Sequence, residues 1–104
     1  MSNAFIIRYE TKPEAADENQ RLVENVFAEL ASEDPGEIRY MNFRLTDGVT
    51  FVHVMINDGE TNPLVGLAAF KEFQSELKDR VVPGSRVQEE VTLVGSYRFL
   101  DAVK

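Results

Sequence analysis

The 104-residue sequence contains no cysteine and only one histidine. The missing cysteines exclude disulfides, thiolate metal sites and cysteine nucleophiles. A single histidine also excludes any metal site that takes several histidines from one chain. We therefore expect no bound metal.

Long apolar runs and positive charge are also scarce. No run approaches the roughly 20 apolar residues that span a bilayer. The first ten residues, MSNAFIIRYE, lack a basic segment followed by a long apolar one, so we expect no secretory signal and a cytoplasmic location. Lys and Arg number 11 against 18 Asp and Glu, which gives a formal net charge of -7. Because the basic residues are also scattered, neither a membrane nor nucleic acid is an expected partner.

What is present indicates one soluble globular domain over residues 1–104, with 43% hydrophobic and 28% charged residues. Residues 5–10 alternate in the manner of a strand. A helix is predicted from a capping box at Thr11 and Glu14 to about Ser32, since apolar residues then recur at helical spacing. The apolar positions of this helix are Leu22, Val23, Val26, Phe27 and Leu30.

The second half of the chain contains two further strands, a helix and a last strand. Residues 38–45 and 49–56 are predicted strands around an Asp-Gly pair, which is typical of a hairpin. A second helix is predicted from the Asn62 cap to the Pro-Gly pair at 83–84. Residues 87–100 are predicted to form a long fourth strand, whose end could reach a partner subunit. The apolar stripe of the second helix is Leu67, Phe70, Phe73, Leu77 and Val81.

The order β-α-β-β-α-β predicts an α+β, ferredoxin-like fold, in which a four-stranded antiparallel sheet carries two helices on one face. Alternation places Val52, Val54 and Ile56 on one side of the third strand and His53 on the other. Much of the second sheet face is apolar, and a monomer would expose more apolar surface than is usual. We therefore predict a homodimer whose sheets pack face to face.

His53 lies within the third predicted strand and is the residue best suited to act as a catalytic base. An unperturbed histidine has a pKa of about 6.5, close to working pH. The alternative is a structural histidine that has a hydrogen-bond partner in the core.

The residues around His53 depend on the hairpin register. A two-residue turn places Asn42 opposite His53 and Tyr40 on the same face, which makes a polar cluster inside apolar walls, as in a ligand pocket. A three-residue turn with a bulged glycine shifts the register by one residue, and Met41 and Phe43 then flank His53.

The element order and apolar pattern resemble the dimeric α/β-barrel superfamily, and within it the antibiotic biosynthesis monooxygenase-like proteins. The resemblance extends over nearly the whole chain, through FIIRYETKPE, ENQRLVENVFAEL, IRYMNFRLTDGVTFVHV, NPLVGLAAFKEFQ and VTLVGSYRF. It implies a homodimer with a small cavity between sheet and helices in each subunit. Some relatives oxygenate phenolic or quinol-like compounds without metal or flavin, others degrade haem, and others have no known activity.

The resemblance implies two alternative functions. One is a cofactor-independent monooxygenase, with His53 as catalytic base and Asn42 or Tyr40 orienting the substrate. The other is a non-catalytic dimeric module that binds a small aromatic or apolar ligand, or a partner protein. The chain departs from the enzymatic members in having no tryptophan, and its second helix lacks the histidine of the haem-degrading members. We therefore expect no haem and no other cofactor.

Overall fold

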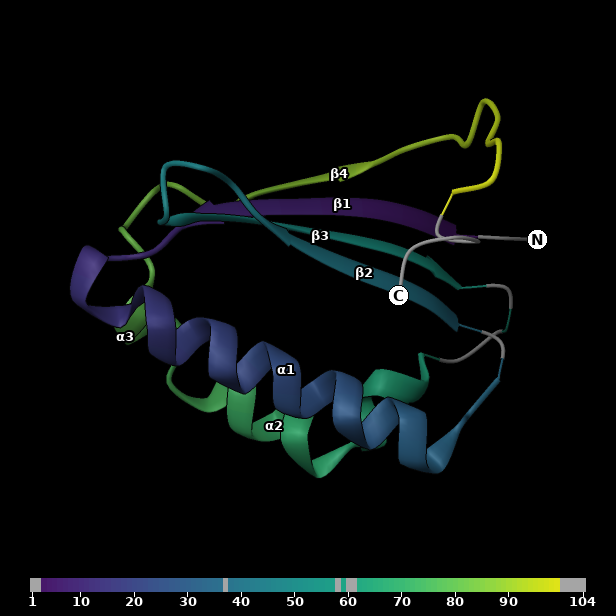
Figure 1. The fold of residues 1–104 in the computed structure, drawn as a ribbon, viewed down its shortest axis with the longest axis horizontal. Helices are drawn as coiled ribbons and strands as arrows, with labels where there is room; N and C mark the ends of the chain where they lie inside the picture. The colour runs from purple at the N-terminus through teal and green to yellow at the C-terminus, as the bar shows by residue number, and fades with distance from the viewer. Residues whose placement is uncertain (1–2, 37, 58, 60–61, 100–104) are drawn as a thin grey trace.

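The computed structural model describes residues 3–36, 38–57, 59 and 62–99, and Figure 1 shows two layers. One layer is an antiparallel sheet of four strands in the order β2-β3-β1-β4, and helices cover one of its faces. The ferredoxin-like α+β fold predicted from the sequence is therefore confirmed. The strands are Asn3–Glu10 (β1), Ile38–Arg44 (β2), Thr50–Asn57 (β3) and Val87–Glu90 (β4).

The helical layer is more divided than predicted. The second helix consists of a 3-10 turn and two short helices, although Asn62 begins it as expected: its Oδ1 accepts from the Leu64 N–H at 2.9 Å. In the described part of the chain, no helix has both the length and the apolarity needed to cross a membrane. The helical elements are Pro13–Ala15 (η1), Ala16–Glu33 (α1), Pro63–Gly66 (η2), Ala68–Ser75 (α2) and Leu77–Arg80 (α3).

The predicted Thr11 cap of the first helix is wrong. The buried Thr11 hydroxyl donates to the carbonyl oxygen of Val49 at 3.2 Å, and its backbone pairs with Val81 in an isolated bridge. The next amide, of Lys12, donates to the carbonyl oxygen of Arg80 at 2.8 Å. The bond to Val49 attaches the end of β1 to the β2–β3 loop. The bonds to Arg80 and Val81 attach it to the residues after α2 and hold the backbone of Arg80 in place.

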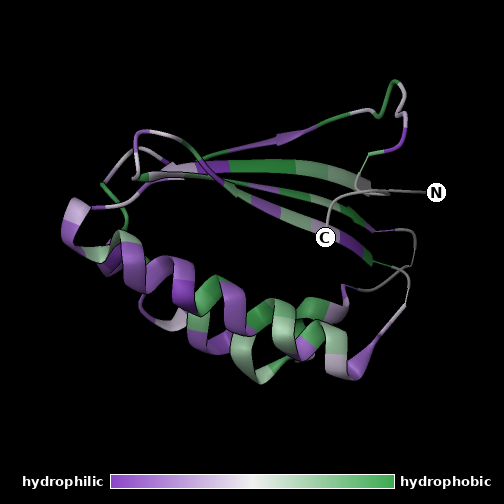
Figure 2. Cartoon of the chain, viewed as in Figure 1, coloured by the Kyte–Doolittle hydropathy of each residue, from purple (hydrophilic) through white to green (hydrophobic). Residues whose placement is uncertain are grey.

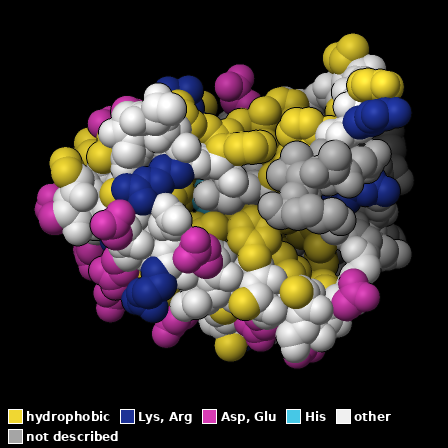
Figure 3. All heavy atoms as spheres, viewed as in Figure 1, with side chains coloured by type: hydrophobic (Ala, Val, Ile, Leu, Met, Phe, Trp, Pro, Cys, Tyr) yellow, Lys and Arg dark blue, Asp and Glu magenta, His cyan; other side chains and the backbone are white. Residues whose placement is uncertain are grey.

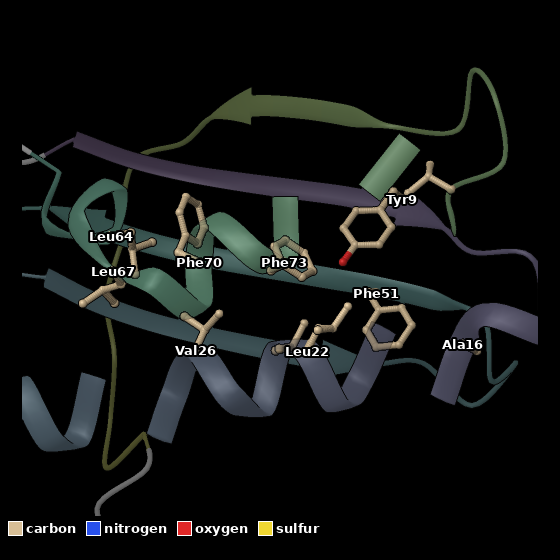
Figure 4. Close-up of a cluster of buried hydrophobic side chains, with 11 residues drawn as sticks. Tyr9, Ala16, Leu22, Val26, Phe51, Leu64, Leu67, Phe70 and Phe73 are labelled. Carbon is tan, nitrogen blue, oxygen red and sulfur yellow. The ribbon is translucent and has the colours of Figure 1, made fainter. Parts of the chain in front are cut away.

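Both predicted helix stripes face the sheet. Figure 2 shows apolar and hydrophilic residues alternating along α1, and the buried ones include Leu22 and Val26. Figure 4 shows them meeting Phe70 and Phe73 of α2 beneath the sheet. Burial of each such side chain contributes roughly 1.5–3 kcal/mol, so this interface contributes substantially to stability.

The β2–β3 hairpin has the register of the two-residue turn but a longer loop. Asn42 pairs with His53, and the Leu45 N–H still donates to the Thr50 carbonyl oxygen at 2.8 Å, so residues 46–49 form a four-residue loop. Loops of two and four residues differ by an even number. The same side chains therefore share a face in either case, and the predicted pairing of Asn42 with His53 is present.

Asp47 and Gly48 explain the longer loop. The Asp47 carboxylate accepts the backbone N–H groups of Val49 and Thr50, both at 2.9 Å, and Gly48 adopts a φ of 81°, which favours glycine. The Thr50 hydroxyl also donates to this carboxylate, and this is the main reason why the pKa of Asp47 is lowered.

The fourth strand is much shorter than the predicted 87–100. It ends at Glu90, residues 91–99 are irregular, and residue 100 lies outside the described part. The reason is that β4 pairs only with β1, from Arg8–Val87 to Phe5–Glu90. The described part of β1 begins at Asn3, so residues after Val91 have no partner strand among the described residues, and Figure 1 shows the chain leaving the sheet.

The sheet face away from the helices is apolar. Val54 and Ile56 of the central strand β3 are only half-buried there, and Phe43 of β2 is 43% exposed. Figure 3 shows further apolar side chains on the surface near residues 91–99, which we call the C-terminal segment. Its exposed apolar side chains are Leu93, Val94, Tyr97 and Phe99.

Candidate functional site

His53 lies at the centre of β3, points toward the helices and is 5% exposed. Both ring nitrogens have tyrosine partners. The Tyr9 hydroxyl lies 2.8 Å from Nε2, and the Tyr40 hydroxyl lies 2.5 Å from Nδ1. The two tyrosines come from β1 and β2, the strands on either side of β3.

The hydrogen bonds continue from Tyr9 into the helical layer. Asn19 of α1 donates from Nδ2 to the Tyr9 hydroxyl at 2.9 Å, and Arg80 of α3 donates from Nε to Asn19 Oδ1 at 3.0 Å. Figure 4 shows the Tyr9 hydroxyl directed from the sheet toward the helices. We call this series the polar chain, and its members are Tyr40, His53, Tyr9, Asn19 and Arg80.

Tyr9, Asn19 and Arg80 are not among the site residues predicted from the sequence, although a signal existed for the last two. Asn19 is fully buried and lies three residues before Leu22, so it belongs to the apolar stripe of α1. Arg80 is 5% exposed and follows Leu77 by three residues. A polar residue at the spacing of an apolar stripe indicates a buried hydrogen-bonding group.

Aromatic rings enclose the polar chain. The Phe73 ring centroid lies 5.7 Å from that of His53, and the Phe27 ring stacks on Tyr40 at 4.9 Å. The guanidinium of Arg80 also lies over the Phe73 ring, 5.3 Å from its centroid. These apolar walls lower the local dielectric constant, which strengthens the hydrogen bonds between them.

Burial keeps the central groups uncharged at neutral pH. It lowers the pKa of His53 to about 4, with a smaller effect from the charge of Arg86. Burial raises the pKa of Tyr9 to about 12, although the Asn19 hydrogen bond acts in the opposite direction. Burial also raises the pKa of Tyr40. His53 is therefore a neutral imidazole between two neutral phenols.

A small cavity of about 40 Å³ borders His53, Tyr9 and Tyr40. This volume is enough for a water molecule or a diatomic gas but not for an aromatic ring. Gln74 and Arg86 line both this cavity and an outer groove of about 620 Å³, so the two lie side by side. The volume of the groove lies within the range of small-molecule sites, which is roughly 300–1,000 Å³.

Asn42, the other predicted substrate-binding residue, lies elsewhere. It is opposite His53 in the hairpin, yet it lines a separate groove of about 240 Å³ beside Phe27 and Phe51. Its Nδ2 is buried and has no hydrogen-bond partner among the described residues. The structure thus brings Tyr40 to His53, whereas Asn42 lies beside a different groove.

The described ranges contain no group of three or more histidine, aspartate or glutamate side chains that could hold a metal ion. The chemistry available to the polar chain is proton transfer. A proton reaches or leaves His53 only through the Tyr9 or Tyr40 hydroxyl, because these occupy both ring nitrogens.

No protein-family model matches the sequence, and no curated protein matches it. Solved structures do match. A candidate antibiotic biosynthesis monooxygenase from Bacteroides thetaiotaomicron has a TM-score of 0.76 at 14% identity, with 89% of this chain and 90% of that chain covered. A second candidate antibiotic biosynthesis monooxygenase, from Nitrosomonas europaea, has a TM-score of 0.71 at 12% identity, with 89% and 90% covered.

A variant of SnoaB, a cofactor-independent oxygenase from Streptomyces nogalater, has a TM-score of 0.65 at 15% identity, with 91% of this chain and 95% of that chain covered. Identities this low establish the fold alone. The chain therefore has the ferredoxin-like fold of the antibiotic biosynthesis monooxygenase-like proteins.

Proposed function

We propose that this chain is a cofactor-independent monooxygenase that acts on phenolic or quinol-like compounds as a homodimer. The observation that carries the proposal is the buried His53 with a tyrosine hydroxyl on each ring nitrogen, beside a small cavity that adjoins an outer groove. The fold, which a cofactor-independent oxygenase shares, supports it. The cytoplasmic location stays a prediction from the sequence.

The substrate itself would supply the electrons. An ionised phenol or enol is electron-rich enough to reduce dioxygen, and a carbon–oxygen bond then forms between the two. For a ring methylene the overall reaction is R₂CH₂ + O₂ → R₂C=O + H₂O. One oxygen atom remains on carbon, and the other leaves as water with the two hydrogens. The small cavity has room for dioxygen, and the outer groove has room for the ring.

His53 and Tyr40 would manage the protons of this reaction. Both line the small cavity, and Tyr40 is the tyrosine that also borders a depression at the end of α1. The roles of His53 as catalytic base and of Asn42 as a substrate-binding residue stay part of the proposal. Because hydroxyl groups occupy both nitrogens of His53, a substrate proton would have to pass through one of the tyrosines.

Dioxygen uptake tests the proposal. The protein, in the presence of a metal chelator, should consume dioxygen with a panel of reduced anthrones and quinols, one molecule for each molecule of product. With ¹⁸O₂, the product should gain one labelled oxygen atom. Uptake no faster than the uncatalysed rate across the panel would reject the monooxygenase.

The alternative, a non-catalytic dimeric module, is favoured by one observation. The hydrogen-bonding groups of His53 are satisfied within the protein, and the cavity beside it is only about 40 Å³. In that case His53→Phe should fold, form dimers and keep its ligand or partner. Loss of dioxygen uptake in the same variant would instead favour the enzyme.

The homodimer makes a separate prediction. We expect a dimer in sedimentation velocity at micromolar concentration, because a second copy would cover the apolar sheet face. Val54→Lys places a charge at the centre of this face and should give a folded monomer, since burying an unpaired charge is costly. The control Ala28→Lys adds the same charge to the exposed side of α1 and should remain dimeric. A stable wild-type monomer contradicts the prediction.

A further inference from the structure

We infer that Asn19, held by Arg80, sets the direction of every hydrogen bond in the polar chain and thereby makes the Tyr40 hydroxyl a proton donor toward a bound ligand. Asn19 is then a positioning residue, and the ligand carries an acceptor oxygen, a phenolate or a carbonyl, where it meets Tyr40. This inference deepens the proposed function, on which it rests only for the identity of the ligand.

The donor-to-acceptor direction of these hydrogen bonds is set first at Arg80. A guanidinium has N–H groups and no acceptor, so the atom of Asn19 that faces Arg80 Nε at 3.0 Å is the oxygen, Oδ1. The amide nitrogen Nδ2 therefore faces Tyr9 and can only donate. A second N–H of Arg80 donates to the Phe73 carbonyl oxygen at 2.7 Å. Arg80 is thus held at two points, and the amide of Asn19 cannot turn over without losing both of its bonds.

The direction passes through Tyr9 to His53. The Tyr9 oxygen accepts from Asn19, so its own proton needs another acceptor. Among the described residues, His53 Nε2 at 2.8 Å is the only other partner of this hydroxyl. Tyr9 is 2% exposed, and a buried O–H without an acceptor is unfavourable. Tyr9 therefore donates to Nε2, which carries no proton.

The direction ends at Tyr40. A neutral imidazole carries one proton, and with Nε2 unprotonated that proton is on Nδ1. The Nδ1–H then donates to the Tyr40 oxygen at 2.5 Å. The hydroxyl proton of Tyr40 has no acceptor among the described residues, and Tyr40 lines both the small cavity and the depression at the end of α1. The Tyr40 hydroxyl can therefore donate its proton in a hydrogen bond to a ligand.

The ligand chemistry follows from this arrangement. An O–H donor inside apolar walls stabilises a negative oxygen more than a neutral hydroxyl, because charge-assisted hydrogen bonds are the stronger ones. Arg86 lines the small cavity and the outer groove, and it adds a positive charge to both. In this direction Nδ1 already carries a proton, so His53 can accept a substrate proton only at Nε2, through Tyr9, while Tyr40 serves as a donor.

The single histidine makes the direction measurable without any substrate. In protein labelled with ¹⁵N-histidine, the shifts of the two ring nitrogens distinguish the protonated from the unprotonated one. The wild type at neutral pH should show a protonated Nδ1 and an unprotonated Nε2. A wild type with protonated Nε2 overturns the inference, and this measurement depends on no variant.

Asn19→Asp should reverse the chain. A carboxylate only accepts, so Asp at this position would accept from both Arg80 and the Tyr9 O–H. The Tyr9 oxygen would then accept from Nε2, which becomes protonated. The control Asn25→Asp adds the same charge on the exposed side of α1 and should leave Nε2 unprotonated. An unprotonated Nε2 in folded Asn19→Asp contradicts the role of Asn19.

The ligand class is tested with para-nitrophenol, whose phenolate absorbs visible light. Bound to the wild type, it should ionise at lower pH than free in solution, and Asn19→Asp should lose this downward shift while Asn25→Asp keeps it. A bound phenol that ionises at the same or a higher pH than the free one overturns the ligand class.

If the tautomer and phenol results hold but no anthrone or quinol drives dioxygen uptake, the monooxygenase fails and the inference stands. If the wild type consumes dioxygen but its Nε2 is protonated, the inference fails and the monooxygenase stands.

Discussion

His53→Ala will lower the rate of dioxygen uptake with a reduced anthrone-type phenol by roughly 100-fold or more, since a positioned acid–base group typically contributes about 10²–10⁴-fold. The substitution removes the centre of the polar chain. Tyr9 and Tyr40 then lose their shared partner, and Tyr40 is no longer polarised by the imidazole. Initial rates from an oxygen electrode, over a range of substrate concentrations, separate the loss in kcat from a change in KM.

Two further variants identify the source of this loss. Tyr40→Phe keeps the ring that stacks on Phe27 but removes the hydroxyl, so it should reproduce most of the effect. Asn25→Ala, on the exposed side of α1, should leave the rate unchanged. Circular dichroism confirms that each variant is folded. Unchanged turnover in His53→Ala would remove His53 from the mechanism.

Acid will destabilise the protein through His53. The pKa of His53 is about 4 in the folded chain, against about 6.5 for an unperturbed histidine. Between these values the unfolded chain binds the proton more readily, so stability rises with pH in this window. The free energy of unfolding should thus be highest above about pH 6.5 and should fall by roughly 3 kcal/mol as the pH drops to about 4.

Urea unfolding at intervals between pH 7 and pH 4 measures this loss, and His53→Phe is the matched control. Phenylalanine keeps a ring in the same place but cannot take up a proton. The contribution of Asp47, whose lowered pKa also makes the fold less stable in acid, is present in both proteins and cancels in the comparison. Parallel pH profiles for the two proteins would show that His53 is not the buried, neutral group described above.

The fold follows from local patterns for identifiable reasons. The spacing of Leu22, Val23 and Val26 predicts a helix with one apolar face, and these residues are buried. Alternation along the third strand places His53 on the face opposite Val52 and Val54, and the observed pairing of Asn42 with His53 is the one that the two-residue turn predicts, despite the longer loop. The fourth strand was predicted too long because its length depends on its pairing with β1, which in the described residues ends at Phe5–Glu90.

The site was predicted in part, and the part that failed is the long-range one. The shared face of Tyr40 and His53 follows from hairpin register, a local property. Asn42 meets the same register condition but lines another groove, since the packing of α1 decides what lies beside each side chain. Tyr9, Asn19 and Arg80 join His53 from separate elements, and no spacing along the chain relates all of them.

The amino-acid sequence by itself determined the order of the elements, the faces of the helices and strands, and the absence of cysteine chemistry. Helical spacing and strand alternation suffice for this, because they act between residues a few positions apart. The tertiary structure alone decided that His53 meets a tyrosine at each nitrogen and that Arg80 lies at the end of the polar chain. These hydrogen bonds join residues 44 positions apart at Tyr9–His53 and 61 apart at Asn19–Arg80, so they form only when the helices pack on the sheet.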